Sequence, residues 1–226
     1  MELTERLLAA ASFVRDGAYF IDVGTDHAYL PIYLAEKGRI SSATASDINE
    51  GPCESARAHI AENGFSDMIE VRRANGLAGH SARGKTDIVI AGMGGALICE
   101  ILEKADFIKD KNVRLILQPM RNVRDLRAYL LCEGFHIVDE ALAREGERIY
   151  EIICVEYCGE AQKESELSLL IGAKNIENRA RDEVLFAAFC KKHASALRKK
   201  IEGMEKGGAD TEGEEALLSG VEDLIG

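Results

Sequence analysis

Residues 18–31 read AYFIDVGTDHAYLP, a short apolar run that ends at a glycine and leads into a helical pattern. The run at 18–23 is apolar without alternation, which is typical of a strand buried on both faces of a parallel sheet. Gly24 permits a sharp turn and lets a ligand approach the backbone. Residues 28–37 are predicted to form a helix, because Pro31 falls in the first turn, where proline is tolerated. A strand, a glycine turn and a helix are the repeating unit of a doubly wound α/β sheet.

The same alternation continues to residue 158. Further strands are predicted at 42–47, 69–74, 86–91 and 113–118, and further helices at 3–14, 52–63, 96–104 and 123–133. Two strand-like segments, 135–143 and 148–157, are separated by only four polar residues, which is too short for a parallel crossover, so we predict an antiparallel hairpin. The predicted fold is a Rossmann-like, doubly wound α/β sheet, mostly parallel, with an antiparallel hairpin strand at its C-terminal edge.

The composition changes after Gly159. Residues 160–206 lack proline and are rich in Glu, Lys, Arg, Ala and Leu, and apolar residues at helical spacing run from 185 to 201. The pair Gly207-Gly208 interrupts this pattern, and residues 214–225 can form a second helix. We predict a small coiled-coil-like helical hairpin here. The two predicted domains are residues 1–158 and 159–226.

Composition bounds the class of protein. The chain has 226 residues, a formal net charge of −11 and 46% hydrophobic residues, which is ordinary for a globular protein. Its longest uncharged stretch is the 12 residues 88–99, too short to span a bilayer, and Glu2 and Glu5 stand where a signal peptide carries positive charge. We therefore expect a cytoplasmic protein with reduced cysteines, no membrane segment and, because no ligand cluster has metal-binding spacing, no metal.

Acidic residues at the ends of the first two strands point to a particular cofactor. Asp22 and Asp26 flank Gly24, and the later glycines of the dinucleotide fingerprint are absent. Two carboxylates oppose a pyrophosphate but suit a ligand with sulfonium or ammonium charge, which favours S-adenosyl-L-methionine over NAD. Asp47 lies 23 residues after Gly24, where a carboxylate can accept ribose hydroxyls. The alternatives are a plain turn in which Asp26 caps the helix, and helix capping by Asp47.

The next three strands also end in residues that can face a ligand. Asn75-Gly76 either contacts an adenine or forms a simple turn. Three glycines among residues 92–95 expose main-chain groups where a methyl acceptor would meet its donor. Gln118 either faces the same cleft or is a surface amide.

Four strings in this order resemble one family: DVGTDHAYLP (22–31), SDINEGP (46–52), AGMGGALI (91–98) and LILQP (115–119). Over residues 1–158 the chain resembles the bacterial tRNA (adenine-22-N1)-methyltransferases. The resemblance implies a class I S-adenosyl-L-methionine-dependent enzyme that methylates N1 of an adenine in the D-arm region of tRNA. The family's cofactor contacts fall on Asp22, Gly24, Asp26, His27, Asp47, Ile48, Asn75, Gly76, Gly92 and Met93. The Asn/Asp-Pro-Pro-aromatic string of amino-group methyltransferases is absent, so the acceptor site cannot follow that pattern.

Adenine N1 already has an in-plane lone pair, so the enzyme must mainly align donor and acceptor. N1 lies on the Watson–Crick edge, so the base must be unpaired and drawn out of its stack. We predict that His27 or Tyr29 contacts the extruded base, with helix packing as the alternative for Tyr29. The predicted catalytic-site residues are His27, Tyr29, Gly92, Met93, Gly94, Gln118 and Pro119.

Basic residues are clustered despite the negative net charge. Lys192 and Lys199 lie seven apart and share one face of the predicted tail helix; the alternative is a solvated face balanced by Glu202 and Glu205. The predicted RNA-binding residues are Arg121, Arg124, Arg127, Lys191, Lys192, Arg198, Lys199 and Lys200. The expected partner is tRNA, and the chain is expected to be a monomer unless it dimerises through its C-terminal helices. The rival functions are methylation of another RNA, a protein amide or a small molecule, and a non-catalytic RNA-binding module.

Overall fold

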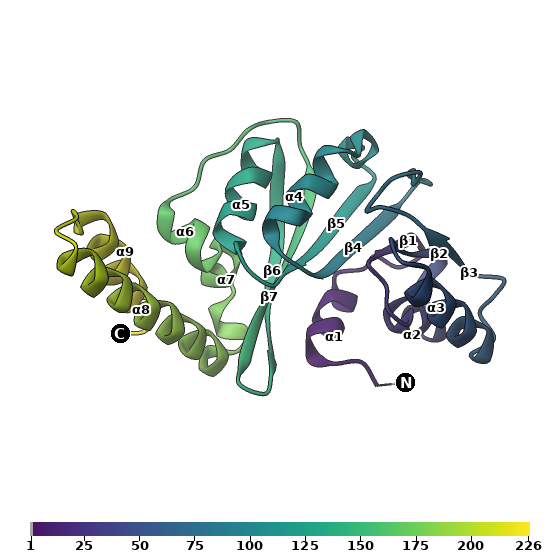
Figure 1. Ribbon diagram of the computed structural model, residues 1–226, viewed down its shortest axis with the longest axis horizontal. Helices are drawn as coiled ribbons and strands as arrows, with labels where there is room; N and C mark the ends of the chain where they lie inside the picture. The colour runs from purple at the N-terminus through teal and green to yellow at the C-terminus, as the bar shows by residue number, and fades with distance from the viewer. Residues whose placement is uncertain (1) are drawn as a thin grey trace. The chain divides into compact units, whose positions relative to one another are not determined.

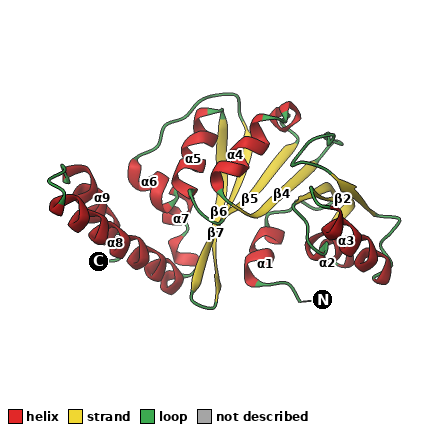
Figure 2. Ribbon diagram, in the orientation of Figure 1, coloured by secondary structure: helices red, strands yellow, loops and turns green. Residues whose placement is uncertain are grey.

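Seven strands form one sheet in the order β3-β2-β1-β4-β5-β7-β6 (Figures 1 and 2). The computed structural model describes residues 2–226, which separate into two compact units, one ending at Gln162 and one beginning at Lys163. The sheet lies within the first unit. Its strands are β1 (Ala18–Val23), β2 (Ile40–Asp47), β3 (Ile69–Arg73), β4 (Thr86–Met93), β5 (Val113–Pro119), β6 (Phe135–Glu145) and β7 (Arg148–Tyr157).

Helices cover both faces of this sheet (Figure 2). Neighbouring residues of a strand point to opposite faces, so Phe20 and Ile21 enter different cores. The Phe20 core includes residues of the first three helices of this unit, and the Ile21 core includes residues of the other three. This two-sided burial explains the apolar run of β1, in which every residue is buried. The helices of this unit are α1 (Glu5–Ser12), α2 (Tyr29–Glu36), α3 (Glu50–Glu62), α4 (Gly95–Glu103), η1 (Asp106–Lys109) and α5 (Val123–Cys132).

The predicted mostly parallel, doubly wound sheet is confirmed, with one change at its C-terminal side. β1 to β5 pair in parallel, whereas β7 runs antiparallel to both β5 and β6. The antiparallel strand therefore lies inside the sheet, and β6 forms the edge. The predicted four-residue turn is also too long, because Glu145 pairs with Arg148 across the hairpin and Gly146 turns the chain at φ +60°.

The second unit is helical. The long helix α8 (Glu183–Lys206) and the helix α9 (Glu212–Asp223) pack against each other, as the apolar stripe and the Gly207-Gly208 break predicted. The Asp182 carboxylate caps α8 by accepting the Leu185 N–H at 2.9 Å. Three short helices that the sequence did not predict precede α8: α6 (Glu166–Ile171), α7 (Ala173–Glu177) and η2 (Arg179–Arg181). No helix within residues 2–226 is long and apolar enough to cross a membrane.

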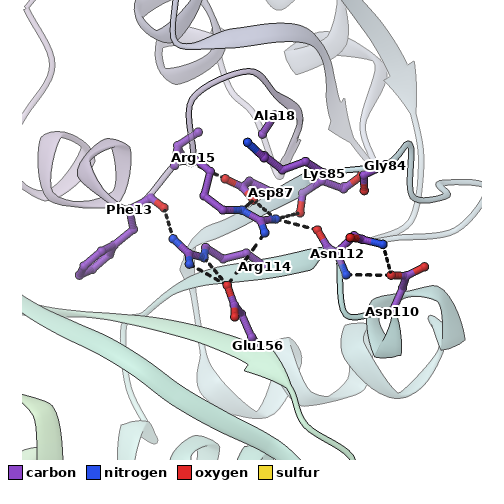
Figure 3. A network of polar contacts seen from close by, with 12 residues as sticks. Phe13, Arg15, Ala18, Gly84, Lys85, Asp87, Asp110, Asn112, Arg114 and Glu156 are labelled. Atoms are coloured by element: carbon purple, nitrogen blue, oxygen red, sulfur yellow. Dashed lines mark hydrogen bonds and ion pairs between the residues drawn. The ribbon is translucent and has the colours of Figure 1, made fainter.

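Charged side chains at the amino ends of the central strands are paired with one another (Figure 3). The Arg15 backbone N–H and Nε donate to the two carboxylate oxygens of Asp87 at 2.5 and 2.7 Å, and Asp87 is fully buried. Arg114 donates to Glu156 at 2.7 and 2.9 Å and to the Phe13 carbonyl at 3.2 Å. These contacts fasten the segment after α1 to the amino edge of the sheet.

Candidate active site

The loop after β1 is tied to the end of β2 by backbone hydrogen bonds. The N–H groups of Gly24 and Thr25 both donate to the Ser46 carbonyl, at 2.8 and 2.9 Å. Gly24 has φ +79°, a conformation that glycine adopts without strain. The Thr25 hydroxyl accepts the N–H of Ala28, the residue before α2, at 3.1 Å, and no side chain within residues 2–226 caps α2, so the alternative that Asp26 caps this helix is wrong. Asp26 is exposed and lies 3.4 Å from the His27 ring nitrogen.

Asp22 is a buried carboxylate at the end of β1. Burial raises its pKa to about 6, and a hydrogen bond with the Thr25 side chain opposes that rise. Asp22 forms no ion pair with any Lys, Arg or His among residues 2–226. A buried carboxylate without a cation is suited to a ligand that brings positive charge.

The end of β2 presents an acceptor beside an apolar side chain. Asp47 Oδ1 accepts the Asn49 N–H at 2.7 Å, while Oδ2 makes no hydrogen bond within the described part of the chain. Ile48, the next residue, is 52% exposed, which is unusual for isoleucine. A free carboxylate oxygen next to an exposed apolar surface suits the ribose and base of a nucleoside.

The loop after β3 lies beside this pair. The Ala74 N–H donates to the Asp47 carbonyl at 2.9 Å, and the exposed Asn75 follows. Gly76 has φ +58°, and a Cβ there would lie 2.9 Å from Ile101 of α4. Gly76 therefore meets a packing requirement of α4, whereas the Asn75 side chain is available to a ligand.

A bulge forms the end of β4. Ala91 pairs with Gln118 and Met93 with Pro119, so Gly92 is an extra residue that leaves the register, at φ +79°. The Met93 methyl group lies 2.3 Å from the position that a Cβ would take on Gly24, so the loops after β1 and β4 are in contact. Bulges of this kind often redirect a strand next to an active site.

The other two glycines after β4 lie against the loop after β5. A Cβ on Gly95 would lie 2.5 Å from the Asn122 carbonyl oxygen, and the Gly95 N–H donates to the Arg121 carbonyl at 2.9 Å. A Cβ on Gly94 would lie 3.2 Å from Arg121 Nε. The close approach of the backbone after β5 thus accounts for Gly95, which the sequence interpretation had explained by ligand access, whereas the neighbour of Gly94 is only the exposed Arg121 side chain.

Gln118 is completely buried, so the alternative of a surface amide is wrong. Its Oε1 accepts hydrogen bonds from the Gly92 N–H at 3.0 Å and from Arg6 Nη1 at 2.7 Å. No sequence pattern indicated Arg6, because it lies on α1, more than a hundred residues from its partner. The neighbouring Pro119 is buried as well.

Three rings gather after β1. His27 and Tyr29 have ring centroids 5.2 Å apart, and Tyr29 meets His59 of α3 edge-to-face at 5.0 Å. His59 Nδ1 also lies 2.9 Å from the His27 carbonyl oxygen. Tyr29 is 41% exposed, so it is not a core residue of α2. No motif in the sequence pointed to His59, so sequence reasoning missed this cluster.

The predicted basic residues after β5 differ in exposure. Arg121 is exposed and has no ion pair or hydrogen bond from its side chain within residues 2–226. Arg124 is half-buried and has a partner. Arg127 is fully buried and bound to Glu140 at 2.7 Å and Glu151 at 2.5 Å. The prediction that Arg127 contacts RNA is therefore wrong, because its guanidinium neutralises two carboxylates inside the sheet domain.

The basic residues of α8 also fall into two groups. Arg198 and Lys200 are paired with acidic residues of α9, at 2.5 and 2.6 Å. Glu202 pairs with Lys206, so it does not balance the cluster as the alternative supposed. Three exposed cations of α8 have no partner in the part of the chain that the structure describes: Lys191, Lys192 and Lys199. Within the same residues, no group of three or more His, Cys, Asp or Glu could hold a metal ion.

The carboxylate, glycine turn and bulge at the carboxyl edge of this Rossmann-like sheet fit a methyltransferase, and comparison with known proteins shows that class. Residues 3–153 match the family described as "Methyltransferase domain", to which the chain belongs. The chain is 39% identical over 160 residues to the tRNA (adenine(22)-N(1))-methyltransferase of Bacillus subtilis. That match covers 69% of this chain and 66% of the relative, just under two thirds of its length.

Solved structures extend the likeness to the whole chain. The Streptococcus pneumoniae protein Sp1610, described as a putative tRNA (m1A22) methyltransferase and solved with S-adenosyl-L-methionine, is 36% identical, with full coverage of both chains and a TM-score of 0.83. The B. subtilis m1A22 tRNA methyltransferase TrmK is 29% identical, covers 99% of this chain and 96% of its own, and has a TM-score of 0.77. The chain belongs to the family of the tRNA (adenine-22-N1)-methyltransferases, as the resemblance implied.

Proposed function

We propose that the protein transfers a methyl group from S-adenosyl-L-methionine to N1 of adenine 22 in tRNA. The observation that carries the proposal is the buried Asp22 carboxylate, which lacks a cation and adjoins the loops after β2 and β4. The names of relatives that align over the whole chain, one of them solved with this cofactor, support the same activity.

The residues at the carboxyl edge fit this cofactor. Asp22 suits a positively charged group, and the free Oδ2 of Asp47 can accept a ribose hydroxyl. The exposed Ile48 offers an apolar surface to the adenine, and Asn75 a hydrogen-bonding amide. Gly24, in the β1 loop itself, lies against the Met93 side chain of the loop after β4. Asp26 is exposed, so we assign it a smaller share of the binding free energy.

The cofactor, when bound, supplies a methyl group on a positively charged sulfur. Adenine N1 forms the new N–C bond with its in-plane lone pair, and the electrons of the broken S–C bond stay on sulfur. The positive charge then resides on the adenine ring, so the protein need not remove a proton in this step. Alignment of the two reactants is what the chain must provide.

An extruded adenine needs a surface on which to stack. We propose that His27 and Tyr29, supported by His59, form that surface. Flipped bases are commonly held between aromatic side chains, and Tyr29 is exposed enough to make such a contact. The Gly92 bulge then holds the acceptor edge of the base opposite the methyl group, and the buried Gln118 supports the bulge from behind through the Gly92 N–H.

The phosphates of tRNA require cations despite the net charge of −11. Arg121, beside the site, and the exposed lysines of α8 are the unpaired basic residues predicted for this role. Arg198 and Lys200 can join them, because exposed ion pairs contribute little free energy and exchange readily for phosphate. The tail unit would then bind tRNA through the basic residues that the sequence predicts for this role.

Labelled methyl transfer tests this function. Unmodified total RNA, which contains tRNA and other RNA, is incubated with the protein and methyl-labelled S-adenosyl-L-methionine, and the labelled RNA and nucleoside are identified by mass spectrometry. We expect N1-methyladenosine, with no label transferred to protein or to other RNA. Tight cofactor binding without transfer to any tRNA would favour the non-catalytic RNA-binding module, and label in another RNA would favour a different substrate.

A further inference from the structure

Arg6 brings a cation from α1 to the carboxyl edge of the sheet. Its Nη1 donates to Gln118 Oε1 over 2.7 Å, and lies 3.9 Å from the position that a Cβ would take on Gly92. The side chain is 22% exposed. A guanidinium from the N-terminal helix therefore adjoins the bulge at which the proposed transfer occurs.

The contacts of Gln118 fix the orientation of its amide. Oε1 accepts from both Arg6 and the Gly92 N–H, while Nε2 donates to the Pro119 carbonyl at 3.0 Å. Rotation of the amide by 180° would place its NH2 group against two donors, which costs the hydrogen bonds of a fully buried group. Arg6 thus fixes the orientation of the Gln118 amide, and the Gln118 amide fixes the position of the Gly92 backbone N–H.

Arg6 is itself held by the β6–β7 hairpin. Its backbone N–H donates to Glu145 Oε1 at 3.2 Å, its Nε lies 3.6 Å from the same oxygen, and its guanidinium lies 5.5 Å from the centre of the Tyr150 ring. A planar guanidinium can make these contacts and the Gln118 hydrogen bond together, whereas a lysine ammonium cannot. The hairpin and the bulge are therefore coupled through one side chain.

We propose that Arg6 is a positioning residue for methyl transfer, acting through Gln118 on the backbone of Gly92. This inference rests on the proposed function, because it needs an acceptor base aligned at the bulge. A shift of about 1 Å in the alignment of reactants can lower a rate by about 100-fold. Loss of the Arg6 contact should therefore lower kcat more than it lowers affinity or stability.

Arg15 provides a matched control. It follows α1, its side chain is 21% exposed, and it is bound to the carboxylate of Asp87, but it lies at the opposite edge of the sheet. Arg6→Lys and Arg15→Lys are the same chemical change in similarly exposed, paired arginines. Glu145→Gln is a milder third variant, since it weakens the hold on Arg6 without altering Arg6 or Gln118.

The experiment measures kcat and KM for tRNA, the Kd of S-adenosylhomocysteine and the melting temperature of each variant. We expect Arg6→Lys to lower kcat by about tenfold or more, with KM, Kd and melting temperature close to wild type, and Glu145→Gln to lower kcat by a smaller factor. Arg15→Lys should lower the melting temperature and leave the kcat of the folded protein within about twofold.

Arg6→Lys with wild-type kcat would overturn the inference, as would a loss of kcat that follows melting temperature in both arginine variants. A wild-type protein that methylates no tRNA would instead overturn the proposed function, and the inference with it. The wild-type reaction therefore distinguishes the two failures.

Discussion

The two ends of the parallel strands, called here the amino edge and the carboxyl edge of the sheet, differ in whether their buried carboxylates have a cationic partner. At the amino edge, Asp87 is buried but receives two hydrogen bonds from Arg15, and Arg114 pairs with Glu156 (Figure 3). At the carboxyl edge, Asp22 is almost as buried and has no cationic partner among residues 2–226. Both edges are built from the ends of the same strands, so the difference is one of side-chain chemistry.

We infer from this difference that the charges at the amino edge stabilise the fold, whereas those at the carboxyl edge serve ligand binding. At the amino edge a cation compensates the buried charge: burial raises the pKa of Asp87 as well, but the hydrogen bonds and the charge of Arg15 oppose that rise. The carboxyl edge keeps an unpaired carboxylate, an exposed isoleucine and a bulge, each of which costs free energy in the isolated protein. A ligand that supplies positive charge and an apolar base would offset those costs, so the account predicts opposite outcomes for one substitution made at both edges.

The largest expected effect is on activity at the carboxyl edge. Asp22→Asn keeps the shape of the side chain and removes its charge, and we expect the rate of methyl transfer at subsaturating cofactor to fall by about 100-fold, a loss of about 3 kcal/mol. The free energy of unfolding at pH 7.5 should stay unchanged or rise, because ionisation of Asp22 opposes folding. Kinetics and chemical denaturation of the same preparation measure both quantities. A destabilised variant with normal activity would contradict the contrast.

The second effect is on stability at the amino edge. In Asp87→Asn an NH2 group would face the donors of Arg15, which leaves buried polar groups unpaired. We expect the free energy of unfolding to fall by about 3 kcal/mol, with kcat of the folded protein unchanged. Urea denaturation and activity below the unfolding transition test this. A large loss of kcat at full stability would show that the two edges are not separate.

The third effect is a pH dependence. The pKa of Asp22 is about 6, so below that pH the carboxyl is mostly protonated and neutral and no longer attracts a cationic ligand. Affinity for S-adenosyl-L-methionine should rise about tenfold per pH unit up to about 6 and level off above it. Calorimetry tests this, with neutral methylthioadenosine as the control ligand and Asp22→Asn as the control protein. Both controls should be flat near pH 6.

The raised pKa of Asp22 also makes the free energy of unfolding depend on pH. Because the pKa of Asp22 is raised in the folded protein, its contribution to stability is complete below the ordinary value of 3.8 and is lost as the pH rises through about 6. Wild type should therefore lose stability relative to Asp22→Asn over that interval. Equal pH profiles of unfolding for the two proteins would show that Asp22 is not desolvated.

The smallest effect is on tRNA binding. Arg121 is exposed beside Gly94, whereas Arg39 is a partly exposed arginine bound to Asp16 near the amino edge. Arg121→Ala should weaken tRNA binding a few-fold and reduce the slope of log K against log salt by about 1. Arg39→Ala should leave that slope unchanged. Filter binding at several salt concentrations measures this slope. Equal slopes for the two variants would show that Arg121 does not contact tRNA.

Local patterns predicted the sheet well. The bounds of β1 and β7 match the predicted segments, since a buried run between glycines or polar turns has few alternative structures. The ends of the parallel strands supplied the candidate site, because one edge of such a sheet collects them. The sequence could not show that β7 would enter beside β5, which depends on how the hairpin folds back.

Long-range partners limited the prediction of the site. Arg127 looked like one of three equally spaced arginines, and only the fold brings Glu140 and Glu151 to it. Arg6 and His59 showed no motif, because their roles come from contacts with residues far along the chain. Gly95 was assigned to ligand access, although the loop after β5 requires it. Spacing along one element was informative, whereas pairing between elements was not.

The most direct test of the central claim compares two tRNAs that differ only at position 22. One carries adenine and the other guanine, and each is incubated with the wild-type protein and methyl-labelled S-adenosyl-L-methionine. The account predicts one labelled methyl group per adenine-22 tRNA, recovered as N1-methyladenosine, and none in the guanine-22 tRNA. Equal labelling of both tRNAs, or no labelling of either, would contradict it.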